Sequence, residues 1–225
     1  MRAMILAAGR GERMRPLTDT TPKPLLPVGG KPLIVWHIER LKKAGIDEIV
    51  INLAYLGEKI EAYLGDGSRY GVKIAYSYEG EKGGLETLGG IVNALSLLGN
   101  DPFWVVNGDI FTDYPMASDV LLPEDCDAHL VVVPNPPHHP YGDFDVCEGK
   151  LYDRPRYTFA GIGLYRPALF KGIGVQKAPL APLLRQAMAQ KRVCGEVYHG
   201  VWIDVGTPQR LKQADTTAYA NSLLT

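Results

Sequence analysis

The chain has 225 residues, of which 46% are hydrophobic and 22% are charged, and this size and composition are typical of one globular domain. Its 24 basic and 25 acidic residues leave a net charge of −1. That balance argues against the basic surfaces of proteins that bind nucleic acids or anionic membranes. We therefore expect neither nucleic acid nor membrane as a partner, and any anion site must be local.

The first half of the chain alternates short apolar runs with amphipathic segments. Such alternation predicts an α/β fold with a mostly parallel, Rossmann-like central sheet flanked by helices. The apolar runs end at glycines or polar residues, as buried strands do. The predicted strands span residues 3–9, 48–54, 73–78 and 102–109, and the predicted helices span 32–45, 55–65 and 89–99.

The pattern changes near residue 113, where strand-like segments begin to follow one another without helices between them. We predict one domain over residues 1–225, with an open-sheet half (1–113) and a smaller mixed or antiparallel half that carries the closing helices (114–225). The last helix begins at Thr207, a good N-cap, followed by Pro208. The other predicted elements are strands at 128–135, 143–149, 150–153 and 157–165, a helix at 178–191, and a hairpin or paired strands at 196–206.

The three cysteines, Cys126, Cys147 and Cys194, have neither metal-ligand nor redox spacing. We predict that they are reduced thiols of a cytoplasmic protein. The apolar run at residues 3–8 is too short for a signal peptide or a membrane span.

The stretch "LAAGRGERMRPLTDTTPKPLLPV", residues 6–28, follows the first predicted strand and is rich in glycine, proline and cations. Loops at that edge of an open α/β sheet bind ligands, and glycine lets backbone N–H groups approach an anion. Between Gly9 and Pro24 the charge is +2, and the prolines stiffen the chain. The stretch predicts a polyphosphate cradle, although the glycines also suit plain turns and the cations a solvated face. The cations are Arg10, Arg13, Arg15 and Lys23, against Glu12 and Asp19.

Two familiar nucleotide motifs are absent from this stretch. Met14 stands where the dinucleotide fingerprint needs its third glycine, which argues against an NAD-dependent enzyme. Gly30-Lys31 is followed by Pro32 instead of the serine or threonine of a P-loop.

Two distant aspartates stand at the ends of predicted strands. Asp109 ends "VVNGD", and Asp204 lies in "VWIDVGT". Each alone also suits a turn, but beside a phosphate loop the pair predicts a Mg²⁺ site, because Mg²⁺ is held by one or two carboxylates together with phosphate oxygens. The chain has no credible Ser-His-Asp or Cys-His set, so catalysis would depend on positioning and electrostatics.

The stretch "AGRGERMRPLTDTTPKPLLPV" resembles the signature of the sugar-1-phosphate nucleotidyltransferases. That pattern runs Gly-x-Gly, x-Arg, Met or Leu, x-Pro-Leu-Thr, and later Pro-Lys-Pro-Leu before Pro-Val. The resemblance implies a GT-A-like fold in which a sugar 1-phosphate attacks the α-phosphorus of an NTP and pyrophosphate leaves. It implies that Arg15 stabilises the α-phosphate, that Lys23 holds the phosphates, and that Asp109 and Asp204 hold Mg²⁺. The residues implied to hold the nucleotide phosphates along the loop are Ala8, Gly9, Arg10 and Gly11.

The segment "YEGEKGGLETLGGI", residues 78–91, is where the resembled family contacts the base. Thr87 and Gly89 match the family pattern, whereas Glu86 and Leu88 depart from it. Glu79 or Glu81 can accept a hydrogen bond from uracil or from guanine, so the residues leave the base open.

The segment "NPPHHPYGDF", residues 135–144, resembles the N-acetylmuramate-1-phosphate uridylyltransferase subgroup of bacterial cell-wall recycling. The resemblance implies transfer of a uridylyl group from UTP to this sugar phosphate by a monomer. It also implies a sugar site at Asn107, Gly142, Asp143 and Gly161. Adjacent His138 and His139 suit a polar loop rim better than a shared metal ion.

Two alternatives stay open from the sequence. A mannose-1-phosphate guanylyltransferase or another hexose-1-phosphate enzyme is compatible with Leu88. A non-catalytic nucleotide-sugar sensor is the alternative outside enzymes, and the presence of Arg15, Lys23, Asp109 and Asp204 argues against it.

Overall fold

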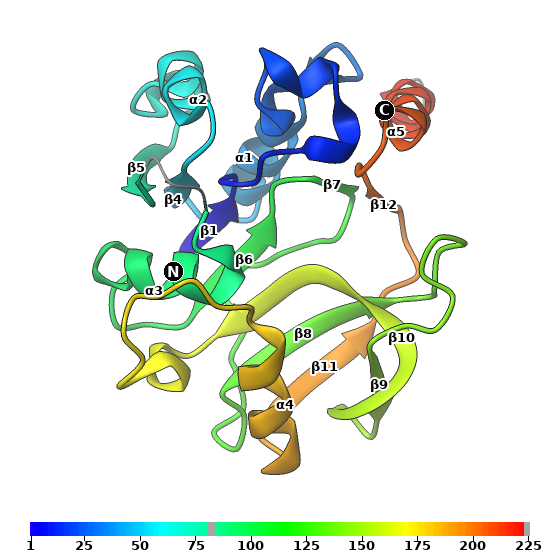
Figure 1. The fold of residues 1–225 in the computed structure, drawn as a ribbon. Helices are drawn as coiled ribbons and strands as arrows, with labels where there is room; N and C mark the ends of the chain where they lie inside the picture. Colours follow the sequence, from blue (N-terminus) through cyan, green and yellow to red (C-terminus); the bar gives the residue numbers. More distant parts are fainter. Residues whose placement is uncertain (81–83, 223–225) are drawn as a thin grey trace.

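The computed structural model describes residues 1–80 and 84–222 and places an eight-stranded sheet at its centre (Figure 1). Its strands are β1 (Arg2–Leu6), β4 (Glu48–Leu53), β5 (Lys73–Tyr78), β6 (Phe103–Asn107), β8 (Ala128–Val133), β9 (Phe144–Cys147), β10 (Lys150–Tyr165) and β11 (Val193–Val197). The order is β11-β8-β10-β6-β1-β4-β5, with β9 paired to β10. β1, β4, β5 and β6 are parallel, and β10 joins β6 antiparallel. The predicted α/β class with a mostly parallel sheet and a smaller mixed region is confirmed.

Helices cover both faces of the sheet (Figure 1). They are α1 (Leu33–Lys43), α2 (Gly57–Leu64), α3 (Glu86–Leu98), α4 (Ala181–Ala189) and α5 (Pro208–Ser222). Successive side chains of β1 point to opposite faces, so Ala3 and Ile5 pack in the cluster of α1 and α2, while Met4 packs in the cluster of α3 and α4. The predicted N-cap of α5 is confirmed, because Thr207 Oγ1 accepts a hydrogen bond from the Arg210 N–H at 3.3 Å.

Short elements complete the chain. Two further strand pairs are β2 (Pro27–Val28) with β3 (Lys31–Pro32) and β7 (Ile110–Thr112) with β12 (Trp202–Asp204). The 3-10 turns are η1 (Glu12–Met14), η2 (Leu17–Asp19), η3 (Lys23–Leu25), η4 (Ser68–Tyr70) and η5 (Pro167–Phe170). Within the described residues, no helix is both long enough and apolar enough to cross a bilayer.

Two strand predictions are wrong in detail. Residues 150–153 and 157–165 belong to the single long strand β10, whose register against β9 shifts between Tyr152 and Tyr157. Residues 196–206 form no hairpin, because β11 pairs in parallel with β8 and β12 pairs with β7. Strands of one predicted half therefore pair with strands of the other, as β10 does with β6 and β12 with β7. Both halves contribute to one sheet.

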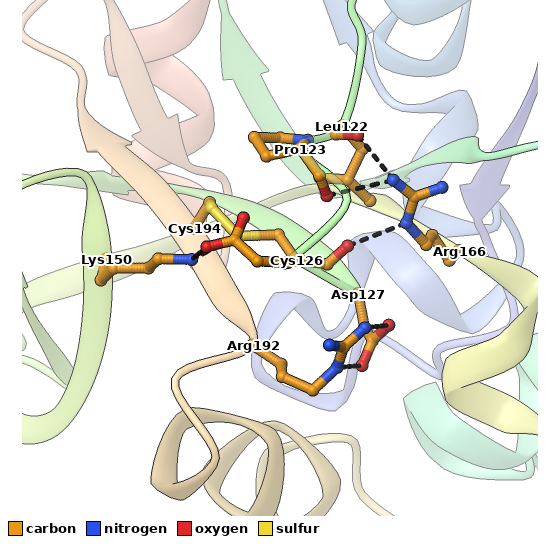
Figure 2. Close-up of a disulfide and its surroundings, with 9 residues drawn as sticks. Leu122, Pro123, Cys126, Asp127, Lys150, Arg166, Arg192 and Cys194 are labelled. Carbon is orange, nitrogen blue, oxygen red and sulfur yellow. Dashed lines mark hydrogen bonds and ion pairs between the residues drawn. A yellow bond between two sulfur atoms is a disulfide. The ribbon is translucent and has the colours of Figure 1, made fainter.

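A disulfide joins Cys126 to Cys194 across 68 positions of sequence (Figure 2). The prediction of three reduced thiols is therefore wrong for this pair, while Cys147 is free and exposed. The parallel pairing of β8 with β11 brings the two cysteines together, and no local spacing could show this. Charged side chains surround the disulfide, among them Lys150, whose Nζ lies 3.1 Å from Cys126 Sγ.

Reduction of this disulfide is expected to lower the free energy of unfolding by about 2–4 kcal/mol, because the cross-link closes a long loop in the unfolded chain. Urea unfolding of a Cys147→Ser variant with and without dithiothreitol measures the change. That variant removes the free thiol from the comparison. Equal midpoints under the two conditions would contradict the prediction.

His37 on α1 is buried in the core. Burial and the neighbouring Arg40 charge lower the pKa of His37 from 6.5 to about 3. Between pH 6.5 and about pH 3, His37 is therefore protonated in the unfolded chain and neutral in the folded chain. Stability contributed by the neutral ring is present above pH 6.5 and is lost as the pH falls toward 3.

A His37→Leu variant is accordingly expected to lose less stability than the parent on acidification. The difference amounts to about 1.4 kcal/mol for each pH unit between 6 and 4. Urea unfolding at stepped pH measures it, with His199→Leu as the control, because His199 is exposed. Parallel curves for His37→Leu and the parent would refute the expectation.

Candidate active site

The basic loop after β1 is held in one conformation by its own buried residues. Met14 is fully buried and packs with Leu26 and Phe111. Thr18 Oγ1 donates a hydrogen bond to the Gly11 carbonyl at 2.7 Å. Gly11 has a φ of +64°, and a β-carbon there would lie 2.9 Å from Thr18 Cγ2, so glycine is needed at this position. The loop is therefore stiff before any ligand arrives.

A cavity of about 750 Å³ opens where β1, β4, β5 and β6 end. Parallel strands present their carboxyl ends at one edge, where ligands of open α/β sheets bind. Among the residues that the structure describes, the cations lining the cavity are Arg10, Arg13, Lys23 and Lys177. The sequence-predicted residues that line it are Ala8, Gly9, Arg10, Gly11, Lys23, Glu79, Thr87, Asn107 and Asp109.

Lys23 and Asp109 form the ion pair at the centre of this cavity. Lys23 Nζ donates to Asp109 Oδ2 at 2.7 Å. The Lys23 residue is only 7% exposed, whereas the Asp109 side chain is 38% exposed and faces the cavity. A buried lysine needs such a partner, and the pair places one cation and one carboxylate beside the glycine loop.

Asp204 reaches the same region through the pairing of β12 with β7. The Val205 N–H donates to the Asp109 carbonyl at 2.8 Å, so the two aspartates are neighbours along paired backbones. Asp204 does not itself line the cavity. Its Oδ2 lies 3.1 Å from Arg210 Nη2 and 3.2 Å from His138 Nε2.

Gly206 lines the cavity, and three charged side chains lie close to it. A β-carbon on Gly206 would lie 2.2 Å from Arg210 Nη2, 2.9 Å from Arg13 Nη2 and 3.1 Å from Asp204 Oδ1. Arg13 Nη2 and Asp204 Oδ1 therefore both lie close to the space above Gly206. Sequence reasoning missed Arg210 and Gly206.

Arg15, predicted to be catalytic, does not line the cavity. Its side chain is 58% exposed, and its Nε lies 3.3 Å from Asp19 Oδ1. Arg13 occupies the cavity instead. The signal was present in the sequence, because the resembled signature carries its arginine two positions after the second glycine, and Arg13 stands at that place.

Glu79 lines the cavity, but both of its carboxylate oxygens are bound by the protein. Oε1 accepts from Asn52 Nδ2 and Oε2 from the Leu85 N–H, each at 2.6 Å. Asn52 Oδ1 in turn accepts from the Ala7 N–H at 2.7 Å. Glu79 therefore braces three segments of the cavity wall, and its contact with a base stays a prediction. Glu81 lies outside the described residues.

The first turn of α3 docks on the chain before α4. The Leu88 N–H and the Gly89 N–H both donate to the Ala178 carbonyl, at 3.0 and 3.3 Å. A β-carbon on Gly89 would lie 2.2 Å from the Gln176 carbonyl oxygen, so this glycine allows close packing and does not line the cavity. Leu88 is buried in the core. Thr87 faces the ligand side.

A second cavity of about 440 Å³ shares Glu86, Thr87 and Asn107 with the first. Asp143 lines it, and Asp143 Oδ2 accepts from the Phe159 N–H at 2.8 Å. Gly142 and Gly161 do not line either cavity.

Each of these two glycines packs too closely against a neighbouring residue to leave room for a β-carbon. A β-carbon on Gly142 would lie 2.7 Å from Asn135 Oδ1, and one on Gly161 would lie 2.4 Å from Asn107 Nδ2.

The adjacent histidines His138 and His139 contact different carboxylates, since His139 Nε2 lies 3.1 Å from Asp143 Oδ1 and His138 is beside Asp204. The two rings therefore do not share one site.

Comparison with known proteins matches this architecture. The model of the family described as Nucleotidyl transferase matches residues 2–149. The chain belongs to the nucleotidyl transferase family. The predicted family is thereby confirmed.

This nucleotidyltransferase is similar to two curated proteins over almost its whole length. The N-acetylmuramate alpha-1-phosphate uridylyltransferase of Neisseria meningitidis serogroup B is 58% identical, covering 98% of this chain and 99% of the relative. The protein of the same name from Caulobacter vibrioides is 34% identical and covers 92% of each chain.

A solved structure from Bacillus anthracis, assigned as a glucose-1-phosphate thymidylyltransferase, has a TM-score of 0.85 to this chain. It covers 97% of this chain and 95% of its own, at 23% identity. At that identity the likeness supports the fold alone.

Proposed function

We propose that this nucleotidyltransferase transfers the uridylyl group of UTP to N-acetylmuramate 1-phosphate, giving UDP-N-acetylmuramate and pyrophosphate in cell-wall recycling. The observation that carries the proposal is the 58% identity to a protein of that name over nearly the whole of both chains. Two adjoining cavities that share Thr87 and Asn107 give room for a nucleotide and a sugar on either side of one phosphate.

The reaction needs no protein nucleophile. A phosphate oxygen of the sugar 1-phosphate attacks the α-phosphorus of UTP, the bond to the bridging oxygen breaks, and pyrophosphate leaves. We assign the loop from Ala8 to Gly11 to the nucleotide phosphates through its backbone N–H groups. Lys23 and Arg13 supply positive charge there, and Arg13 takes the role that the sequence suggested for Arg15.

Asp109 and Asp204 suit a magnesium ion as a donor set. Each carboxylate has its Oδ2 atom paired with a cation, and in the described residues no ion pair uses either Oδ1. Carboxylate oxygens beside phosphates are the ligands that Mg²⁺ prefers. Bound Mg²⁺ would neutralise charge on the phosphates, while Lys23 and Arg210 hold the two carboxylates in place.

The sugar site is proposed at Asn107 and Asp143, with Gly142 and Gly161 shaping the backbone around them. Thr87 lies between this site and the nucleotide site. We further propose a cytoplasmic monomer, and light scattering coupled to size exclusion tests the oligomeric state.

The activity matrix of four NTPs against several sugar 1-phosphates tests the proposal, with pyrophosphate release as the readout. We expect UTP with N-acetylmuramate 1-phosphate to give the highest kcat/KM. Release with GTP and mannose 1-phosphate alone would favour the guanylyltransferase. Binding of UTP without any turnover would favour a sensor. In the sequence, Leu88 was the residue compatible with a guanylyltransferase. Because Leu88 lines neither cavity, it does not support that alternative.

A further inference from the structure

The second cavity has an apolar wall and a basic residue at one side. Phe144, Phe159, Leu180 and Leu184 supply the apolar surface. The acids Glu86 and Asp143 also line it, and among the lining residues that the structure describes Arg185 is the one basic residue. A ligand group with negative charge would be repelled by the two acids, so only the Arg185 side of this cavity is suited to an anion.

Arg185 lies on α4, and part of its guanidinium group is available to a ligand. Its Nε donates to Asp153 Oδ1 at 2.9 Å, and its Cζ lies 6.0 Å from the centre of the Phe144 ring. Within the part of the chain that the structure describes, its terminal nitrogens have no hydrogen-bond partner. Both members of the pair are about half exposed, 47% and 51%. Exposed ion pairs are weak, so Arg185 can exchange Asp153 for a ligand at little cost.

The proposed substrate presents a matching group. N-acetylmuramate 1-phosphate bears a lactyl ether whose carboxylate is lacking in N-acetylglucosamine 1-phosphate and in mannose 1-phosphate. The lactyl methyl and the acetamido methyl suit an apolar wall. The terminal nitrogens of an arginine bind a carboxylate with two parallel hydrogen bonds.

We propose that Arg185 binds the lactyl carboxylate of the sugar, an inference that rests on the proposed function. This contact determines the preference for N-acetylmuramate 1-phosphate over sugar phosphates without a lactyl group. The cations of the first cavity, Arg10, Arg13, Lys23 and Lys177, are assigned to the nucleotide side under the proposed function. Arg154 and Arg156, the other arginines of this region, pair with the buried carboxylate of Asp145. Arg185 is therefore the cation placed for a second negative group on the sugar.

The test compares KM and kcat of Arg185→Ala for two sugars, with UTP as the common nucleotide. For N-acetylmuramate 1-phosphate we expect KM to rise about 10- to 100-fold, because a charge-assisted pair is lost. For N-acetylglucosamine 1-phosphate, which lacks the lactyl group, we expect KM to stay within about twofold of the parent. Arg185→Lys should recover part of the loss, since it restores charge without the bidentate geometry.

Asp153→Asn is the matched control, because it breaks the same ion pair and leaves the guanidinium. We expect it to keep the sugar preference. Calorimetric binding of UDP-N-acetylmuramate and UDP-N-acetylglucosamine gives the same comparison without turnover, and Arg185→Ala should weaken only the first.

Three results would overturn the assignment: equal changes for both sugars in Arg185→Ala, no change for either, or the same loss in Asp153→Asn. A folded parent protein that is inactive with UTP and N-acetylmuramate 1-phosphate would instead refute the proposed function and this inference with it. An active parent isolates the role of Arg185.

Discussion

Replacing Arg13 with alanine is expected to lower kcat for pyrophosphate release by about 10²- to 10³-fold, because a preorganised cation is lost where charge develops on the phosphates. Arg13 lines the nucleotide cavity, and its guanidinium approaches Gly206 beside Asp204. The matched Arg15→Ala variant should stay within about threefold of the parent. Arg15 is exposed and pairs with Asp19, and it does not line the cavity.

Initial rates with UTP and N-acetylmuramate 1-phosphate decide between the two arginines. The comparison is well matched, because both variants remove an arginine from the same loop and neither arginine is buried. Thermal unfolding of both variants checks that the loop remains folded. If Arg15→Ala loses activity and Arg13→Ala keeps it, Arg15 is the arginine that stabilises the α-phosphate, as the sequence suggested, and Arg13 is not.

The Asp109→Asn variant is expected to lose about 10³-fold or more in kcat, because an amide binds Mg²⁺ far less well than a carboxylate does. Asparagine has the same shape and can still accept the hydrogen bond from Lys23 that Asp109 Oδ2 receives at 2.7 Å. The loss should therefore come from the missing charge and not from a collapsed loop.

Metal affinity provides a second measurement that does not depend on turnover. Paramagnetic Mn²⁺ binding in the presence of UTP should weaken in Asp109→Asn and stay unchanged in Asp119→Asn. Asp119 is an exposed acid of the segment after β7 and serves as the control. Parent-like activity of Asp109→Asn with parent-like Mn²⁺ binding would rule out Asp109 as a metal ligand.

Local sequence placed most of the residues predicted for nucleotide binding at the first cavity, and their roles stay predictions. Glycine, proline and cations after the first strand predicted a stiff anion-binding loop, and Ala8 to Gly11 and Lys23 do line the cavity. Asp109 was expected at the ligand edge because it follows a parallel strand, and it does line the cavity there, whereas its role as a metal ligand stays a prediction. In each case the signal comes from residues close together in the chain, whose hydrophobic period and turn chemistry determine the local backbone.

Contacts between distant segments required the tertiary structure. Arg13 and Arg15 have the same chemistry two positions apart, and only the folded loop turns Arg13 inward. Glu79 Oε1 is bound because Asn52 stands on the neighbouring strand, and Oε2 is bound by the Leu85 N–H. Cys126 meets Cys194, and Arg185 lines the second cavity, through strand and helix packing that joins residues far apart in sequence. From the sequence alone follow the family, the order of most elements and a glycine-rich, basic loop after the first strand. Side-chain direction and long-range pairing depend on the packing of the whole chain, because they follow from which surfaces the sheet buries together.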